Sequence, residues 1–202
     1  MLISRNGFTP AVGSTSVVAS SAQIVGNVTI GERCYVDYNV VIESSGAPIV
    51  IDDETIIFAN SVIRSVGGTS RPAFPVHIGN RTLISPLCAL VGCTVGSNCY
   101  IATAALIFQG ATIGDNCRIA AGAIIHLKTA LPAGTNIGLR HIAVPAADGY
   151  LATADIQQAR AAIAGADFFQ TVFEESSHDT RLHSAVIDRL WQEVSAWNDS
   201  QA

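Results

Sequence analysis

An aliphatic residue recurs at every sixth position through most of the 202-residue chain. The period is clearest after residue 100, where successive hexads begin with Ile101, Ile107, Ile113, Ile119 and Ile125. Earlier hexads begin with Ile24, Ile30, Val36, Ile42, Ile51, Ile57, Ile63, Ile78, Ile84 and Leu90. A six-residue period matches neither a helix nor one amphipathic strand. It indicates a solenoid of short stacked strands.

The form of solenoid that this period predicts is a left-handed parallel β-helix, a mainly β fold. Three hexads make one triangular coil, and the first residue of each hexad points into the prism. Left-handed crossovers run against the usual right-handed rule, so the prediction depends on the strength of the repeat. We therefore expect a continuous interior ladder of Ile, Val and Leu.

Composition and charge limit the function classes. Hydrophobic residues make up 49% of the chain and charged residues 13%, as expected for one well-packed domain. A net charge of -5 argues against a nucleic-acid or anionic-membrane surface. The first 14 residues lack a charged start followed by an apolar core, and no apolar run approaches the roughly 18 residues of a membrane span. We expect a soluble cytoplasmic protein.

The repeat divides the chain into two regions. Residues 1–148 are expected to form the β-helix, with a polar lead-in over 1–20 and a loop at 65–77 that protrudes where glycines and prolines interrupt the ladder. Residues 149–202 lose the period. Their apolar residues follow helical spacing, so we expect C-terminal α-helices that pack on the solenoid or on a neighbouring subunit.

Four of the five cysteines occupy the small fifth position of a hexad, which predicts packing inside the prism. They are Cys34, Cys88, Cys99 and Cys117. Cys93 lies where the spacing shortens to five residues and is expected near a corner. No CxxC spacing or local basic group indicates redox or nucleophilic chemistry.

Residues 21–148 resemble the γ-class carbonic anhydrases and their hexapeptide-repeat relatives. The resemblance rests on VVIESSGAPIVIDDETIIFANSVIR at 40–64, on SPLCALVGCTVGSNCYIATAALIFQGATIGDNCRIAAGAII at 85–125, and on the ALPAG and VPA segments that follow. The segment AAIAGADFF also looks like that family's C-terminal helix. The resemblance implies a homotrimer of β-helices with clefts between the subunits.

The positions that hold zinc in the family carry other residues here. Its three histidines correspond to Arg64, Pro86 and Val91, none of which can ligate zinc as the family does. A catalytic zinc needs three protein ligands and an open position for water. We therefore expect no metal, no cofactor and no carbonic anhydrase activity. The family's polar residues around the metal correspond to Ile42, Ser44, Ile56, Phe58 and Ala59.

One interpretation keeps the cleft and changes its ligand. Phe58, Pro86 and Val91 would form an apolar wall, and Arg64 would place a cation where the zinc stood. A guanidinium in a partly dry cleft suits a small anionic or acyl ligand. The candidate cleft residues are Arg64, Phe58, Ser44, Glu43, Pro86, Val91, Arg71 and His77, with Arg71 as a second cation. The competing interpretation of Arg64 is a salt bridge to Glu43 or to another acid.

Two other functions stay open, so the sequence does not decide whether the protein is an enzyme. The first is a non-catalytic scaffold or interaction protein, in which apolar residues fill an unused cleft. The second is an acyl-CoA-dependent hexapeptide acyltransferase, which needs a histidine base. His126 is the best candidate because its hexad position points outward; His77 and His141 are the others. His178 and His183 resemble helix-flanking surface residues.

Assembly is expected from apolar residues on the outside of the solenoid. We expect Ile42, Ile56, Phe58, Val91 and Phe108 on the outward face. A monomeric solenoid does not normally expose that much apolar surface. The sequence thus predicts a homotrimer.

Overall fold

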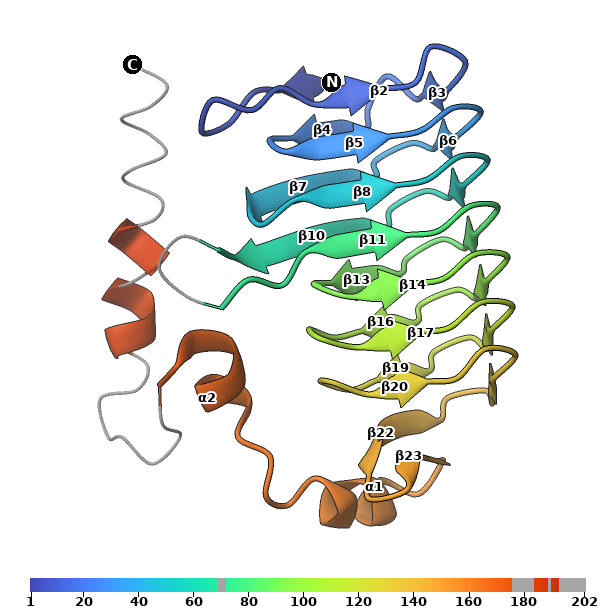
Figure 1. Ribbon diagram of the computed structural model, residues 1–202, viewed down its shortest axis with the longest axis vertical. Helices are drawn as coiled ribbons and strands as arrows, with labels where there is room; N and C mark the ends of the chain where they lie inside the picture. The colour runs from blue at the N-terminus through green and yellow to red at the C-terminus, as the bar shows by residue number, and fades with distance from the viewer. Residues whose placement is uncertain (69–71, 176–183, 189, 193–202) are drawn as a thin grey trace.

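The computed structural model is a parallel β-solenoid with short helices near its C-terminus (Figure 1). It describes residues 1–68, 72–175, 184–188 and 190–192. Each turn of the chain contributes one strand to each of three sheets, and every neighbouring pair of strands within the solenoid is parallel. The fold is the left-handed parallel β-helix that the six-residue period predicts.

The first sheet is the longest and carries the candidate site. Its strands are β1 (Leu2–Ile3), β4 (Gln23–Val25), β7 (Val41–Gly46), β10 (Val62–Gly67), β13 (Ala89–Val91), β16 (Leu106–Ile107), β19 (Ile124–Ile125), β22 (Ile142–Ala146) and β23 (Gly149–Thr153).

The other two sheets have seven strands each. The second contains β2 (Ala11–Val12), β5 (Val28–Ile30), β8 (Ile49–Ile51), β11 (Val76–Ile78), β14 (Thr94–Val95), β17 (Thr112–Ile113) and β20 (Ala130–Leu131). The third contains β3 (Val17–Val18), β6 (Tyr35–Val36), β9 (Ile56–Ile57), β12 (Leu83–Ile84), β15 (Tyr100–Ile101), β18 (Arg118–Ile119) and β21 (Asn136–Ile137).

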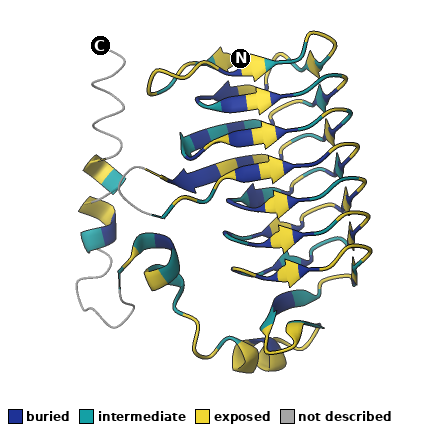
Figure 2. Ribbon diagram, in the orientation of Figure 1, coloured by how far each residue is buried: buried dark blue, intermediate teal, exposed yellow. Residues whose placement is uncertain are grey.

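The first residue of each hexad forms the interior ladder, and Figure 2 shows these buried positions along the strands. In the first sheet the ladder consists of Ile24, Ile42, Ile63, Leu90, Ile107 and Ile125, each at most 1% exposed. Ile42 was expected on the outward face and this is wrong. It pairs in register with Ile24 and Ile63, so it points inward as they do.

The residues at the small fifth position of the hexads pack inside the prism and also form hydrogen bonds. Before the third sheet, one column consists of Cys34, Thr55, Thr82, Cys99 and Cys117. Each donates its S–H or O–H to a backbone carbonyl of the next coil, as Thr55 Oγ1 does to Gly79 O at 3.0 Å and Cys99 Sγ to Gly114 O at 3.2 Å. Cys93 is also inside the protein, where burial raises the pKa of its thiol to about 12.

Three boundaries differ from those expected. Residues 1–20 form the first coil, because β1, β2 and β3 pair with β4, β5 and β6. The segment between strands is shorter than 65–77, since β10 extends to Gly67 and β11 begins at Val76. Residues 149–153 form β23, which reverses direction and pairs antiparallel with β22.

Helices follow the last coil. Helix α1 (Ile156–Ala162) begins after its N-cap Asp155 and contacts β22 and β23. Helix α2 (Phe168–Phe173) begins after its N-cap Asp167, and residues 184–188 and 190–192 are also helical. Packing of the rest of 149–202 on the solenoid stays a prediction. No helix within the described residues has the length and hydropathy needed to cross a membrane.

Candidate functional site

Strands β7 and β10 are six residues long, whereas most strands of the solenoid have two or three. They pair over their whole length, from Val41 with Val62 to Gly46 with Gly67, and extend beyond the corner as a two-stranded tongue (Figure 1). Ser44 and Ser65 lie buried inside the tongue, and both donate a hydrogen bond to Ala47 O. Ser44 therefore supports the tongue from within.

An ionic cluster lies at the base of the tongue. Glu43 accepts a hydrogen bond from Arg5 and forms an ion pair with Arg64, whose Nε lies 3.5 Å from Glu43 Oε2. Arg64 Nε also donates to Ser45 Oγ at 3.2 Å. The salt bridge between Arg64 and Glu43 that the sequence left as an alternative is thus present.

Exposure differs strongly among the three charged side chains. Those of Arg5 and Glu43 are 17% and 24% exposed, whereas that of Arg64 is 49% exposed. Burial alone would raise the pKa of Glu43, but the Arg5 hydrogen bond and the nearby positive charges bring that pKa below its ordinary value. Glu43 is consequently an anion at neutral pH, and the cluster of two guanidinium groups and one carboxylate has a net charge of +1.

Arg64 is part of a column of side chains along one corner of the solenoid. Glu43, Arg64 and Val91 are aligned by strand register. Continuing the register by one residue places Phe108 after Val91 and His126 after Phe108; the last two rings have centroids 6.1 Å apart. We call these five residues the corner column. It changes from charged to apolar and then to a half-buried histidine.

The segment between β10 and β11 packs beside the middle of the corner column. Phe74 forms an isolated antiparallel bridge with Val66, with N···O distances of 3.0 and 2.7 Å. Its side chain lies against Gly92, where an added Cβ would come within 2.4 Å of Phe74 Cβ. Gln109 also lies beside Gly92, with its Cγ 3.3 Å from the same point. Phe74, Gly92 and Gln109 therefore pack together next to the column.

Two polar atoms near the His126 end of the column are buried without a hydrogen-bond partner within the described part of the chain. They are Gln109 Oε1 and His126 Nδ1. Burial lowers the pKa of His126 below its ordinary value, so its imidazole is neutral at pH 7. Buried polar atoms in folded proteins are nearly always paired, which makes these two exceptional.

The other predicted cleft residues lie elsewhere in a single chain. Phe58 and Pro86 follow β9 and β12 at the corner between the third and first sheets, away from Arg64. His77 lies outward on β11, with Nε2 2.9 Å from Asp52 Oδ2. Arg71 lies outside the described residues. Over the described ranges, no group of three or more His, Cys, Asp or Glu side chains is placed to hold a metal.

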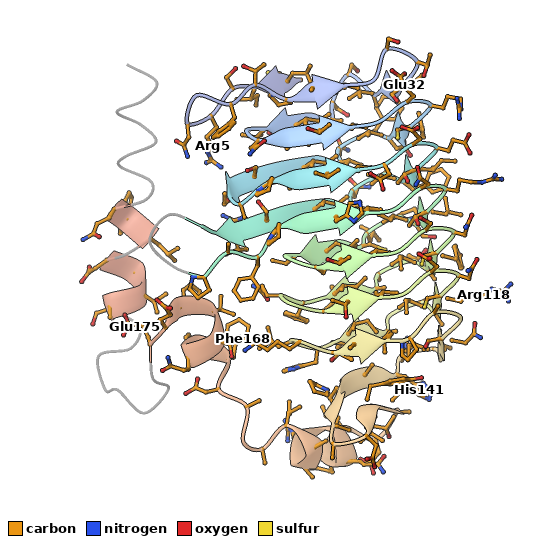
Figure 3. The ribbon with its side chains drawn as sticks, in the orientation of Figure 1. Arg5, Glu32, Arg118, His141, Phe168 and Glu175 are labelled. Atoms are coloured by element: carbon orange, nitrogen blue, oxygen red, sulfur yellow. The ribbon has the colours of Figure 1, made fainter. Side chains whose placement is uncertain are left out.

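Arg5 and Gln109 were not among the predicted site residues. Arg5 belongs to the segment interpreted as a polar lead-in, where the pair Asn6–Gly7 is a recognisable hairpin-turn signal and both residues adopt positive φ. The resulting Arg5–Phe8 bridge brings Arg5 to the left edge of the first coil, as Figure 3 shows. Gln109 has no such local signal, because its burial depends on Phe74 from a distant segment.

No family model matches the chain. Over 126 residues, 62% of the chain, it is 29% identical to the mitochondrial γ carbonic anhydrase 1 of Arabidopsis thaliana. Over this range the chain is similar to a γ-class carbonic anhydrase. It is also 28% identical, over 48% of its length, to an uncharacterized protein of Dictyostelium discoideum. These matches span less than half of each relative, 46% and 40%.

Solved hexapeptide-repeat structures are similar to this chain at low identity. A hexapeptide transferase family protein of Anaplasma phagocytophilum is 20% identical, with 82% of this chain and 91% of that one covered and a TM-score of 0.36. PerB of Caulobacter crescentus, solved with CoA and GDP-perosamine, is 23% identical over 71% of this chain and 56% of its own, with a TM-score of 0.46. Those ligands belong to that protein.

Proposed function

We propose that the protein binds a small anionic ligand at Arg64. The observation that carries this proposal is the Arg5–Glu43–Arg64 cluster, in which two guanidinium groups share one carboxylate. Arg5 and Glu43 are largely buried and hold each other, while half of the Arg64 side chain faces solvent. A planar guanidinium held in this way is suited to bind a carboxylate or phosphate in two-point fashion.

We further propose that the ligand lies between subunits of a homotrimer. Exposed and half-buried apolar side chains support assembly, because they form in-register columns on two of the three sheets. On the third sheet these are Val17, Tyr35, Ile56, Leu83 and Tyr100, and on the first Val41, Val62, Ala89, Leu106 and Ile124. The second sheet presents Thr29, Val50, His77, Thr94 and Thr112, so Val50 alone among these five is apolar. In the trimer, Phe58 and Pro86 of one subunit would face Arg64 of the next.

We propose that no zinc ion serves this site, because Arg64, Pro86 and Val91 offer no imidazole or carboxylate. Metal analysis of protein purified without chelators tests this part directly. We expect less than stoichiometric zinc. One zinc per chain would reject the proposal.

The anion proposal is tested by isothermal titration with acetate, bicarbonate and phosphate. We expect saturable binding by the native protein and at least a tenfold weaker Kd in Arg64→Ala, because the charged hydrogen bonds are lost. Arg33→Ala is a matched control, since Arg33 is exposed and pairs with Glu54 in another part of the solenoid. Equal binding by all three proteins would count against Arg64.

Acyl transfer from a thioester is a second candidate, supported by one observation. The half-buried His126 has a neutral imidazole, and its Nδ1 has no hydrogen-bond partner within the described residues, as a general base requires. In such a reaction His126 would take the proton of an attacking hydroxyl or amine. The new bond to the acyl carbon would form as the carbon–sulfur bond breaks, and the thiolate would receive the proton from the imidazolium.

Binding of acetyl-CoA tests this second candidate. Support would come from micromolar binding that survives Arg64→Ala, together with acyl transfer by the native protein that is lost in His126→Asn. If neither acetyl-CoA nor a longer acyl-CoA binds, the protein is not such a transferase. Absence of binding by anions and thioesters alike would leave the scaffold function as the favoured alternative.

A further inference from the structure

The corner column has chemically different ends. Arg64 lies at one end, and His126 lies three coils further along, after Val91 and Phe108. Neighbouring parallel strands are about 4.8 Å apart, so the two ends are separated by roughly 14 Å. A small anion such as acetate spans only the first part of this distance. The rest of the column is available to a longer molecule.

The middle of the column is apolar. Val91 and Phe108 are half-buried, and Phe74 packs on Gly92 and lies near Gly110, where an added Cβ would be 3.6 Å from Phe74 Cε1. Both glycines have positive φ and leave room for the aromatic ring because they lack a side chain. These surfaces suit a hydrocarbon body, and the exposed Lys128, whose Cγ would lie 3.1 Å from a Cβ added at Gly110, borders them.

The far end has unused hydrogen-bonding capacity. Gln109 is only 7% exposed, and its Oε1 has no partner within the described residues. His126 Nδ1 is in the same situation one coil further on. A side-chain amide can present either its oxygen or its nitrogen, and an imidazole nitrogen can donate or accept according to tautomer. A ligand group that both donates and accepts, such as a hydroxyl or an amide, can pair with either of these side chains whichever role its free atom takes.

We propose that the ligand is an elongated amphiphile with an anionic head at Arg64, an apolar body along Val91 and Phe108, and a hydroxyl or amide at Gln109 and His126. This inference rests on the anion site proposed above and names its substrate class. Because Gln109 Oε1 and His126 Nδ1 have almost no exposed surface, the end group reaches them when neighbouring side chains, among them the Phe74 ring near Gly110, turn away.

The probes that test this are ω-hydroxydecanoate and decanoate, which share a carboxylate and a chain and differ in one hydroxyl. They are titrated into the full-length protein below their micellar concentrations, with acetate as the short anion. We expect the hydroxy acid to bind about three- to tenfold more tightly than decanoate, as one additional neutral hydrogen bond provides. Both should bind more tightly than acetate.

The preference should disappear in Gln109→Leu, which keeps the volume of the side chain and removes its polar atoms. Gln23→Leu is the matched control, because Gln23 is exposed on β4 in the same sheet. The elongated-ligand inference is overturned, and the anion site stands, if acetate binds at Arg64 but the hydroxy acid binds no more tightly than decanoate. The same holds if the hydroxy acid keeps its higher affinity in Gln109→Leu. If neither acid nor acetate binds, both proposals fail together.

Discussion

The prism interior and the corner column are built from adjacent residues of the same strands, yet they satisfy different requirements. Ile63 is fully buried between Ile42 and Leu90, all three aliphatic. Its neighbour Arg64 lies between Glu43 and Val91 and is held by a carboxylate and a hydroxyl. One step along the backbone separates a position fixed by packing from one that retains exposed charge.

This difference shows how a repetitive fold can carry a specific site. The interior must accept almost the same side chain in every coil, because each residue packs on the one above and the one below. The corner column has no such restriction. It runs through charged, apolar and polar residues within five coils, so its chemistry can change while the ladder behind it stays constant.

The largest expected difference between the two regions comes from substituting these neighbours. Ile63→Ala removes a fully buried side chain and should destabilise the protein by about 2–5 kcal/mol, since it leaves a cavity. Arg64→Ala removes one partner of a half-exposed ion pair and should cost less than about 1 kcal/mol. Urea unfolding of both variants measures the contrast. Similar losses would mean that the corner is as constrained as the interior.

A second test concerns the contact between Phe74 and Gly92 beside the corner column. Gly92 has φ +54, and an added Cβ would lie 2.4 Å from Phe74 Cβ, so Gly92→Ala should cost about 1–3 kcal/mol and displace Phe74. Gly134 has φ +77 but no atom within 4 Å of the point that an added methyl group would occupy, so Gly134→Ala should cost only the backbone strain of about 1 kcal/mol. Thermal unfolding and hydrogen exchange at Val66 report the two effects. Equal behaviour would show that the Phe74 contact contributes nothing.

Removing Arg5 should have a smaller effect that depends on pH. Arg5→Ala should cost about 1 kcal/mol at pH 7, because Glu43 loses its hydrogen-bonded partner. The folded state lowers the pKa of Glu43 below its ordinary value of 4.5, so its contribution is present above that pH and is lost as the pH falls through the folded pKa. Unfolding curves of both proteins should therefore converge in acid. A constant difference at all pH values would contradict the role of Glu43.

The smallest expected effect is at the other end of the column. Burial lowers the pKa of His126 below 6.5, so the folded state prefers the neutral imidazole and loses stability as the pH falls below the unfolded value. An NMR titration should give a midpoint below 6.5 for this residue, and His126→Asn should remove the corresponding part of the pH dependence. A midpoint above 6.5 would indicate an acidic partner for the imidazole.

Periodicity was sufficient to predict the interior, because a residue such as Ile63 is identified by its position in the hexad alone. Ile42 shows the limit of resemblance as a guide: its hexad position predicts burial, whereas the family comparison suggested an outward role. The contact between Arg64 and Glu43 was one of the interpretations that the sequence left open, and their register in successive coils brings the two side chains together. Arg5 and Gln109 were missed, since their positions depend on a hairpin and on Phe74, and neither follows the six-residue period.

The reversed strand β23 has a consequence for how these molecules meet end to end. The coil at each end of a solenoid has backbone N–H and C=O groups that could pair with another solenoid, and an open edge of this kind can lead to fibres. Antiparallel pairing with β22 makes β23 the last strand of the first sheet, and α1 lies against the same hairpin. At the opposite end, the edge strands β1, β2 and β3 are two residues long and offer little to pair with. Growth by stacking is thus discouraged at both ends of the longest sheet.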